Sequence, residues 1–381
     1  MGKILNKLGK IKWKHFVNYI AIAIVAVIFS SMTFAGALPQ STLFLLEKIT
    51  MNIILAVSLS LVVGFLGELS LGHAGFMCIG AYMGGKVSTL FANGDSMISL
   101  IVSLIVGALV AGIFGFIIGL PALRLRGDYL AIVTLAFGEI VKTVFENTSD
   151  KTFGGPIGLR TPRFDKHYLF IIGFVLVLIT VFVIQNLLRS KHGRAITAIR
   201  DNEIAARATG INVTKYKLIG FIVSSAFAGI AGVFYSFANS TVKASIFTYN
   251  YSIEILIMVV IGGMGSITGS IISATAITYI NTQLQTLLTG DMAVLKDILY
   301  SLILVVIVIY NNAPALKTFR EKYNLRVLFS KLLRLKRTPG SDKDDEGAWH
   351  RVPTKISIDE ILSTDLKVVE SVQDPDKEDK S

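Results

Sequence analysis

Long apolar blocks, most of them about twenty residues long, dominate the first 312 residues of this 381-residue chain. A helix of that length spans the roughly 30 Å hydrocarbon core of a bilayer at a rise of about 1.5 Å per residue. Inside that core no water is present to bond the backbone, so the blocks must form helices. The chain is 52% hydrophobic and 17% charged, whereas a typical soluble domain is about 25% charged. The sequence therefore predicts an all-α polytopic membrane protein.

The topology follows from where the basic residues lie between the blocks. Starting in the cytoplasm, six crossings return the chain there at a polar segment (residues 189–217), and four more return it at the basic residues after 312. Lys and Arg near span ends mark cytoplasmic loops, so these clusters and the basic loop 121–127 agree with about ten spans and with both termini in the cytoplasm. The predicted spans are residues 16–38, 49–67, 69–85, 97–120, 128–145, 168–188, 218–239, 251–262, 267–288 and 295–311.

Both ends of the chain are polar. Residues 1–15 form a basic N-terminus, residues 313–340 a basic juxtamembrane segment, and residues 341–381 have the composition of a disordered acidic tail. The start resembles a secretory signal, but the apolar run 16–38 is longer than a signal core of about 7–15 residues, so we expect a retained first span. The net charge of +11 reflects orientation and attraction to anionic lipid, and we expect no nucleic-acid partner.

The polar segment carries an apolar pattern at near-helical spacing, which predicts an amphipathic helix. Gly193 and Gly210 bracket it as helix punctuation. Such a helix can bury its stripe in the groove of a partner or in the lipid interface, and the residues alone leave both readings open. The stripe consists of Ala195, Ile196, Ile199, Ile204 and Ala208.

Several predicted spans are short and interrupted by glycine, in both halves of the chain. In transporters such segments indicate broken helices that line a pathway, because exposed backbone at that depth is tolerated only against protein or a water-filled cavity. Segments 67–85 and 261–274 both place glycines and a serine ahead of a small-residue helix, which suggests a distant internal repeat. His73 is a candidate for this pathway, and a structural hydrogen bond is the alternative role for its side chain. The candidate pathway residues are Ser70, Gly72, His73, Gly75, Phe76, Gly262, Gly263, Gly265 and Ser266.

Enzymatic and nucleotide-binding functions find no support. GAYMGGK (80–86) is close to a phosphate-binding loop, but Val87 replaces the required Ser or Thr, so helix packing explains its glycines. The single cysteine, Cys78, permits no disulfide within the chain, and the histidines are scattered. We therefore expect no catalytic residues, no metal and no cofactor. The intramembrane acids Glu68, Glu139 and Glu254 keep an ion-coupled secondary transporter open as an alternative.

Four segments carry a resemblance to a known family. GELSLGHAGFMCIGAYMGG (67–85), LRGDYLAIVTLAFGEI (125–140), GRAITAIRDNEIAARATGI (193–211) and VVIGGMGSITGSIISA (259–274) resemble the LivM-type permease of branched-chain amino acid ABC importers. EIAARATG (203–210) is similar to the loop by which ABC-importer permeases dock on their ATPase subunit, although Ile204 occupies the place of the usual acid. The resemblance covers roughly residues 16–312, and the acidic tail departs from it.

This resemblance implies an ABC-importer permease that passes leucine, isoleucine or valine across a bacterial plasma membrane. Its partners would be a second homologous permease, two ATP-binding subunits and an extracytoplasmic substrate-binding protein. Another substrate of the same family, such as urea or a short amide, is the nearest alternative. By the resemblance, helix 193–210 would couple to the ATPase, through Arg200, Asp201, Glu203, Ala205, Ala206 and Gly210.

Overall fold

The computed structural model describes residues 17–34, 39–91, 96–125 and 127–287, together with residues 301, 302 and 305. The chain divides into two compact units, Met1–Ala313 and Pro314–Ser381, and all described residues belong to the first. The predicted basic N-terminus, the basic segment 313–340 and the acidic tail lie outside the described residues, as does most of the predicted span 295–311.

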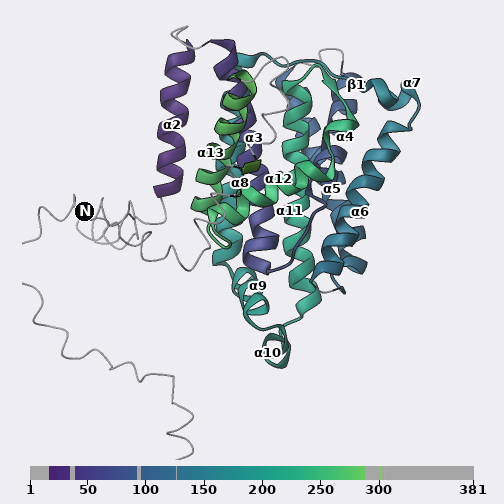
Figure 1. Cartoon of the computed structure of the whole chain (residues 1–381), viewed down its shortest axis with the longest axis vertical. Helices are drawn as coiled ribbons and strands as arrows, with labels where there is room; N and C mark the ends of the chain where they lie inside the picture. Colours follow the sequence, from purple (N-terminus) through teal and green to yellow (C-terminus); the bar gives the residue numbers. More distant parts are fainter. Residues whose placement is uncertain are drawn as a thin grey trace, which may run out of the picture. The chain divides into compact units, whose positions relative to one another are not determined.

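The described part of the first unit is almost entirely helical (Figure 1). Two short strands, β1 (Leu159–Arg160) and β2 (Thr241–Val242), pair antiparallel, with Leu159 opposite Val242. The helices of the first half are α2 (Val17–Phe34), α3 (Gln40–Ser60) with its π-helical extension η2 (Leu61–Leu66), α4 (His73–Leu90), α5 (Met97–Ala122), α6 (Asp128–Glu146), α7 (Asp150–Phe153) and η3 (Gly155–Ile157). The second half has α8 (Lys166–Arg189), α9 (Lys191–Asp201), α10 (Glu203–Ala208), α11 (Val213–Ala238), η4 (Ala244–Ile246), α12 (Tyr249–Gly262) and α13 (Ile267–Leu287).

Four of the described helices are long and apolar enough to cross a membrane: Gln40–Leu66, Met97–Ala122, Tyr168–Arg189 and Val213–Ala238. The predicted span starting at residue 49 was wrong at its beginning, because α3 starts at Gln40. Glu47 and Lys48 interrupt the apolar run, which hid the first turns of this helix from a hydropathy reading. Glu47 is nevertheless buried, with 2% of its surface exposed.

The centre of the bundle is a close packing of α11 against α4, α5 and α3. A Cβ atom on Gly80 of α4 would lie 2.1 Å from the carbonyl oxygen of Gly229 in α11, and one on Gly232 would lie 2.0 Å from the carbonyl oxygen of Met77. These distances mean that backbone meets backbone between the two helices. The glycine at position 80 therefore packs a helix, as the interpretation of GAYMGGK predicted.

Two helices begin inside the bundle rather than at its ends. The chain leaves η2, runs without helical structure through residues 67–72 and starts α4 at His73. The predicted span 69–85 was therefore wrong at its start. At the opposite end of the bundle, β2 and η4 lead into α12, whose 14 residues reach only about 21 Å. The amide of Ala74 donates to Ser252 Oγ at 3.0 Å, so the starts of α4 and α12 meet.

From this meeting point the two helices run to opposite ends. A Cβ on Gly85 of α4 would contact Leu159 of β1, whereas the turn after α12 lies beside Gly64 and Arg200. α4 therefore leads toward the strands and α12 leads toward Arg200. Segment 261–274 contains the end of α12, a turn and the start of α13, and its suggested repeat relation to segment 67–85 stays a prediction.

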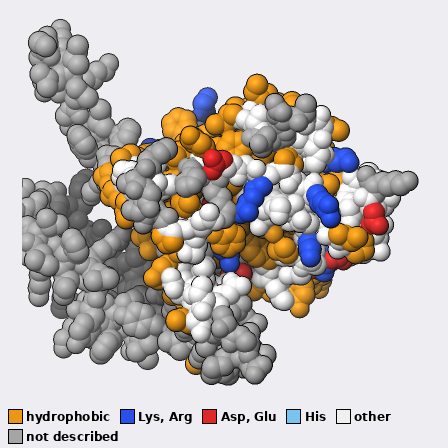
Figure 2. Space-filling model, turned by 90° about the horizontal axis from the view of Figure 1, so that it is seen from above, with side chains coloured by type: hydrophobic (Ala, Val, Ile, Leu, Met, Phe, Trp, Pro, Cys, Tyr) orange, Lys and Arg blue, Asp and Glu red, His pale blue; other side chains and the backbone are white. Residues whose placement is uncertain are grey.

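The two ends of the bundle differ in character. α9 and α10 protrude at one end, and the strands lie at the other (Figure 1). Figure 2 views the molecule from the strand end, where Lys and Arg side chains and a few Asp and Glu side chains are dispersed among hydrophobic and uncharged ones. The polar segment between two spans thus lies at one end, and α7 and the two strands lie at the other.

Candidate functional site

The polar segment folds into two short helices, not the single helix that its apolar spacing predicted. Asn202 separates α9 from α10 with φ −159° and ψ 106°, and its side-chain oxygen accepts a hydrogen bond from the amide of Ala205 at 3.0 Å. An asparagine in this conformation is a favourable N-cap, so it starts a new helix. The prediction failed because an internal cap outweighed the continuous apolar pattern.

The apolar stripe is divided by this break. Ala195 and Ile196 face the bundle, and Ile199 forms a small cluster with Ala206 and Val213. Ile204 points the other way and is 76% exposed. Part of the predicted stripe thus anchors the segment to its own chain, while α10 presents a large apolar side chain outward.

Arg200 connects α9 to the interrupted parts of both halves. Its Nη1 donates to the carbonyl oxygen of Gly64 in η2 at 3.0 Å, and its Nε and Nη2 bond Asp201. Gly67, at φ 79°, lies so close that a Cβ there would be 2.8 Å from Arg200 Cγ. A Cβ on Gly265, in the turn after α12, would be 3.2 Å from Arg200 Nη1. One side chain therefore touches the end of the π-helix and the turn that follows α12.

A second link joins α10 and α11 to the start of the interrupted segment, by which we mean residues 67–90, the non-helical stretch 67–72 followed by α4. Lys217 Nζ forms ion pairs with Glu68 Oε1 and with Glu203 Oε2, the latter at 3.1 Å. The Lys217 side chain is only 4% exposed, against 12% for Glu68 and 22% for Glu203. Ion pairs shielded from solvent in this way are far less screened than surface pairs. We call this group the Lys217 cluster.

The remaining candidates of the polar segment occupy distinct positions around these links. Glu203 also pairs with Arg207 at 3.0 Å, on the exposed side of α10. Ala205 is exposed and Ala206 is buried. Gly210, at φ 83°, follows α10 in a left-handed conformation, and the amide of Ile211 closes the turn by donating to the carbonyl of Ala206. A glycine just after a helix end is the residue that tolerates this geometry.

The candidate pathway residues of the first half are buried among helices. Ser70 and His73 are both 2% exposed, and His73 Nε2 lies 2.8 Å from Ser58 Oγ. Phe76 packs against the rings of Phe137 and Phe221. Gly72 and Gly75 lie against α6, where a Cβ on either would meet backbone atoms at 2.7 Å. In this chain the interrupted segment is covered by protein, as its irregular backbone requires.

The second-half candidates form the turn between α12 and α13. Gly262 packs on Gly269, while Gly263 and Gly265 have positive φ values of 91° and 84°. Ser266 Oγ accepts from the amide of Gly269 at 3.1 Å and so caps α13. The structure thus brings this turn next to Arg200 rather than next to His73.

The intramembrane acids all have partners. Glu68 belongs to the Lys217 cluster. Glu139 pairs with Lys142 at 3.0 Å and accepts from the amide of Tyr249. Glu254 accepts from Asn281 Nδ2 at 2.8 Å. Among the described residues no group of three or more His, Cys, Asp or Glu is placed to hold a metal ion.

Lys217 was missed by the reading of the sequence. Its two partners lie 149 and 14 residues away, so no local pattern connects it to Glu68. The available signal was Lys217 just before the apolar span 218–239, together with Glu68 just before the broken span 69–85. Glu47 and Lys48 were missed because the predicted span began after them.

Comparison with known proteins agrees with the helical membrane-protein fold. Residues 41–308 match the family described as branched-chain amino acid transport system, permease component. The chain is 36% identical over 279 residues to the high-affinity branched-chain amino acid transport system permease protein LivM of Escherichia coli, covering 65% of this chain and 63% of that protein. The LivM protein of Salmonella typhimurium is also 36% identical, over 278 residues and the same shares.

A more distant relative is the ribose import permease protein RbsC of Escherichia coli, 25% identical over 319 residues, with 77% of this chain and 92% of that protein covered. No solved structure matches the chain. The chain spans less than two thirds of the length of the LivM proteins it matches. Its family match nevertheless covers well over half of its own residues, and the chain therefore belongs to the family of branched-chain amino acid transport permease components, which are multi-pass membrane proteins.

Proposed function

We propose that this chain is a permease subunit of an ATP-driven importer for branched-chain amino acids. It forms the translocation pathway together with a second homologous permease, receives substrate from an extracytoplasmic binding protein and is driven by two ATP-binding subunits. It resides in the plasma membrane with α9–α10 on the cytoplasmic side. The observation that carries this proposal is the polar segment, which presents an exposed α10 outward while Arg200 and Lys217 tie it to the interrupted helices.

The coupling mechanism follows from these contacts. A push on α10 by an ATP-binding subunit reaches Glu203 directly, and Glu203 shares Lys217 with Glu68 at the start of the interrupted segment. α9 transmits the same displacement through Arg200 to η2 and to the turn after α12. Energetic coupling between distant sites is carried by packed side chains and ion-pair networks, and the Lys217 cluster with Arg200 is the network that supports this proposal.

Uptake of labelled leucine tests the transport function. We expect deletion of the gene to lower ATP-dependent leucine uptake and a plasmid copy to restore it. Urea and a short amide serve as the competing substrates. Unchanged leucine uptake with reduced urea or amide uptake would assign a different substrate, and transport by this chain reconstituted alone would contradict the requirement for ATP-binding subunits.

Ile204 tests the docking surface. We expect Ile204→Glu to insert normally but to lose co-purification of the ATP-binding subunits, and to lower leucine uptake at least about tenfold. Burying an isoleucine in a partner contributes about 1.5–3 kcal/mol, and a carboxylate there must be desolvated without a partner. The matched control is Thr214→Glu, at an exposed position in the first turn of α11. Retained co-purification by Ile204→Glu would favour the lipid interface as the place where α10 lies.

A further inference from the structure

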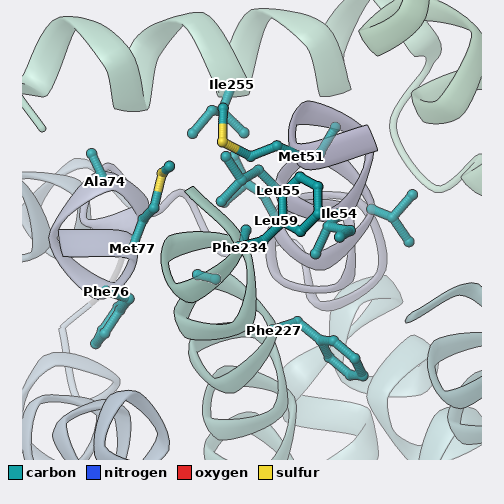
Figure 3. Packing of buried hydrophobic residues seen from close by; sticks show 14 of the residues in the cluster. Met51, Ile54, Leu55, Leu59, Ala74, Phe76, Met77, Phe227, Phe234 and Ile255 are labelled. Atoms are coloured by element: carbon teal, nitrogen blue, oxygen red, sulfur yellow. The ribbon is translucent and has the colours of Figure 1, made fainter. Parts of the chain in front are cut away.

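A cavity of about 310 Å³ lies between α3, α4, α11, η4 and α12. This volume is within the range of about 300–1,000 Å³ that small-molecule sites occupy. Figure 3 shows three of its lining side chains, Met51, Met77 and Phe234, on three different helices. None of the pathway candidates of the interrupted segment lines it.

The cavity lies in the half of the bundle away from α10. Phe44 to Lys48 belong to the first turns of α3, whose far end continues into η2 beside Arg200. Ala238 and Asn239 stand at the end of α11, whose beginning packs against α10. With α9–α10 on the cytoplasmic side, a solute that arrives from outside reaches this cavity before it reaches the Lys217 cluster.

Charges of both signs line this one cavity. Glu47 and Lys48 come from α3, and Glu254 comes from α12, where Asn281 of α13 holds one of its oxygens at 2.8 Å. Ionisable side chains inside membrane helices are costly and mark functional sites by default. A carboxylate and an ammonium on the walls of one small cavity match a ligand that carries both an ammonium and a carboxylate.

Apart from the charged groups and the polar side chains of Tyr235, Asn239 and Tyr251, the wall is apolar. Phe44, Met51, Met77, Phe234 and Ile246 surround the charged groups. Methionine is unbranched and polarizable, so it adapts to aliphatic groups of different shape. The apolar part of this wall accommodates a branched aliphatic side chain.

The cavity is built at the junction of the interrupted helices. Tyr251 Oη donates to Asn52 Oδ1 at 2.8 Å, and Asn52 Nδ2 donates to Thr278 Oγ1 at 2.8 Å. This chain of hydrogen bonds fastens the first turn of α12 to α3 and α13 beside Glu254. Because the start of α12 contacts the start of α4 through Ser252 and Ala74, a ligand in the cavity touches the elements that the coupling contacts move.

We propose that this cavity is an amino-acid binding site within the single subunit. Lys48 binds the substrate carboxylate, Glu254 binds its ammonium, and the two methionines with Phe234 enclose its aliphatic side chain. The assignment rests on the proposed transport of branched-chain amino acids and adds the residues that select the substrate inside the membrane.

The concentration dependence of leucine uptake tests this assignment in vesicles that carry the complete import system. We expect Lys48→Met and Glu254→Gln each to raise the KM for leucine at least about tenfold at matched membrane abundance, with a smaller change in kcat. We expect Met51→Phe to shift the leucine-to-valine KM ratio toward valine, because the larger ring reduces the space. The control is Lys86→Met, a partly exposed lysine of α4 that does not line the cavity.

Cysteine protection gives a measurement that does not depend on turnover. Cys78, which is buried, is first replaced by alanine so that Met51→Cys supplies the chain's sole thiol. We expect leucine to slow alkylation of that thiol by a small maleimide. If Lys48→Met and Glu254→Gln keep wild-type KM values, or if leucine does not slow the alkylation, the proposed binding site is overturned. The proposed transport function still stands in that case, provided that the wild-type protein takes up leucine. Absence of leucine uptake by the wild type would overturn both.

Discussion

Gly232→Ala is expected to be among the most destabilising single-methyl changes in this chain. The added Cβ would lie 2.0 Å from the carbonyl oxygen of Met77 and 2.8 Å from the amide nitrogen of Ala81, both backbone atoms of α4. Backbone cannot rotate away as a flexible side chain can, so α4 and α11 must separate. Overpacking of a close-packed interior costs about 1–3 kcal/mol, and occasionally more, and we expect the upper part of that range here.

The measurement is the thermal unfolding midpoint of the purified protein in detergent, together with its abundance in the membrane. Gly112→Ala is the matched control, because the same methyl group there would meet the Ala226 side chain at an ordinary 3.7 Å. We expect Gly112→Ala to accumulate normally and Gly232→Ala to accumulate poorly. Equal midpoints for the two variants would mean that α4 and α11 are not as closely packed as the structure shows.

Lys217→Met is expected to abolish coupling and to lower stability. The substitution removes the ammonium group that pairs with the carboxylates of Glu68 and Glu203. The side chains of these two residues are only 12% and 22% exposed, so water compensates their charges poorly. Removing one partner of a buried ion pair costs about 3–5 kcal/mol because a charge is left uncompensated. We expect the lower end of that range, since Glu203 keeps its pair with Arg207.

Two comparisons separate the stability effect from the coupling effect. The control Lys215→Met removes an exposed lysine two positions away and is expected to behave as wild type. The double variant Lys217→Met with Glu68→Gln also removes one of the two stranded charges, and we expect it to regain most of the unfolding midpoint but not ATP-driven leucine uptake. If the double variant regains uptake as well, the Lys217 cluster is structural and does not transmit motion.

The helices were predictable because their signal is local. Apolar blocks predicted α5, α8, α11 and α13 to within a few residues, apart from the first turns of α11. Errors arose where a short-range polar feature opposes the general pattern. Glu47 and Lys48 hid the start of α3, and Asn202 divided a segment whose apolar spacing was continuous.

The candidate site was predictable as a region but not as a set of contacts. The sequence by itself determined that the chain is a helical membrane protein with a polar segment between two spans, because hydrophobicity and charge are properties of each stretch alone. Only the tertiary structure decided that Lys217 joins Glu68 to Glu203, that Arg200 reaches Gly64, and that Lys48 and Glu254 line one cavity. The partners Lys217 and Glu68, like Arg200 and Gly64, lie more than a hundred residues apart in the chain, and helix packing alone brings them together.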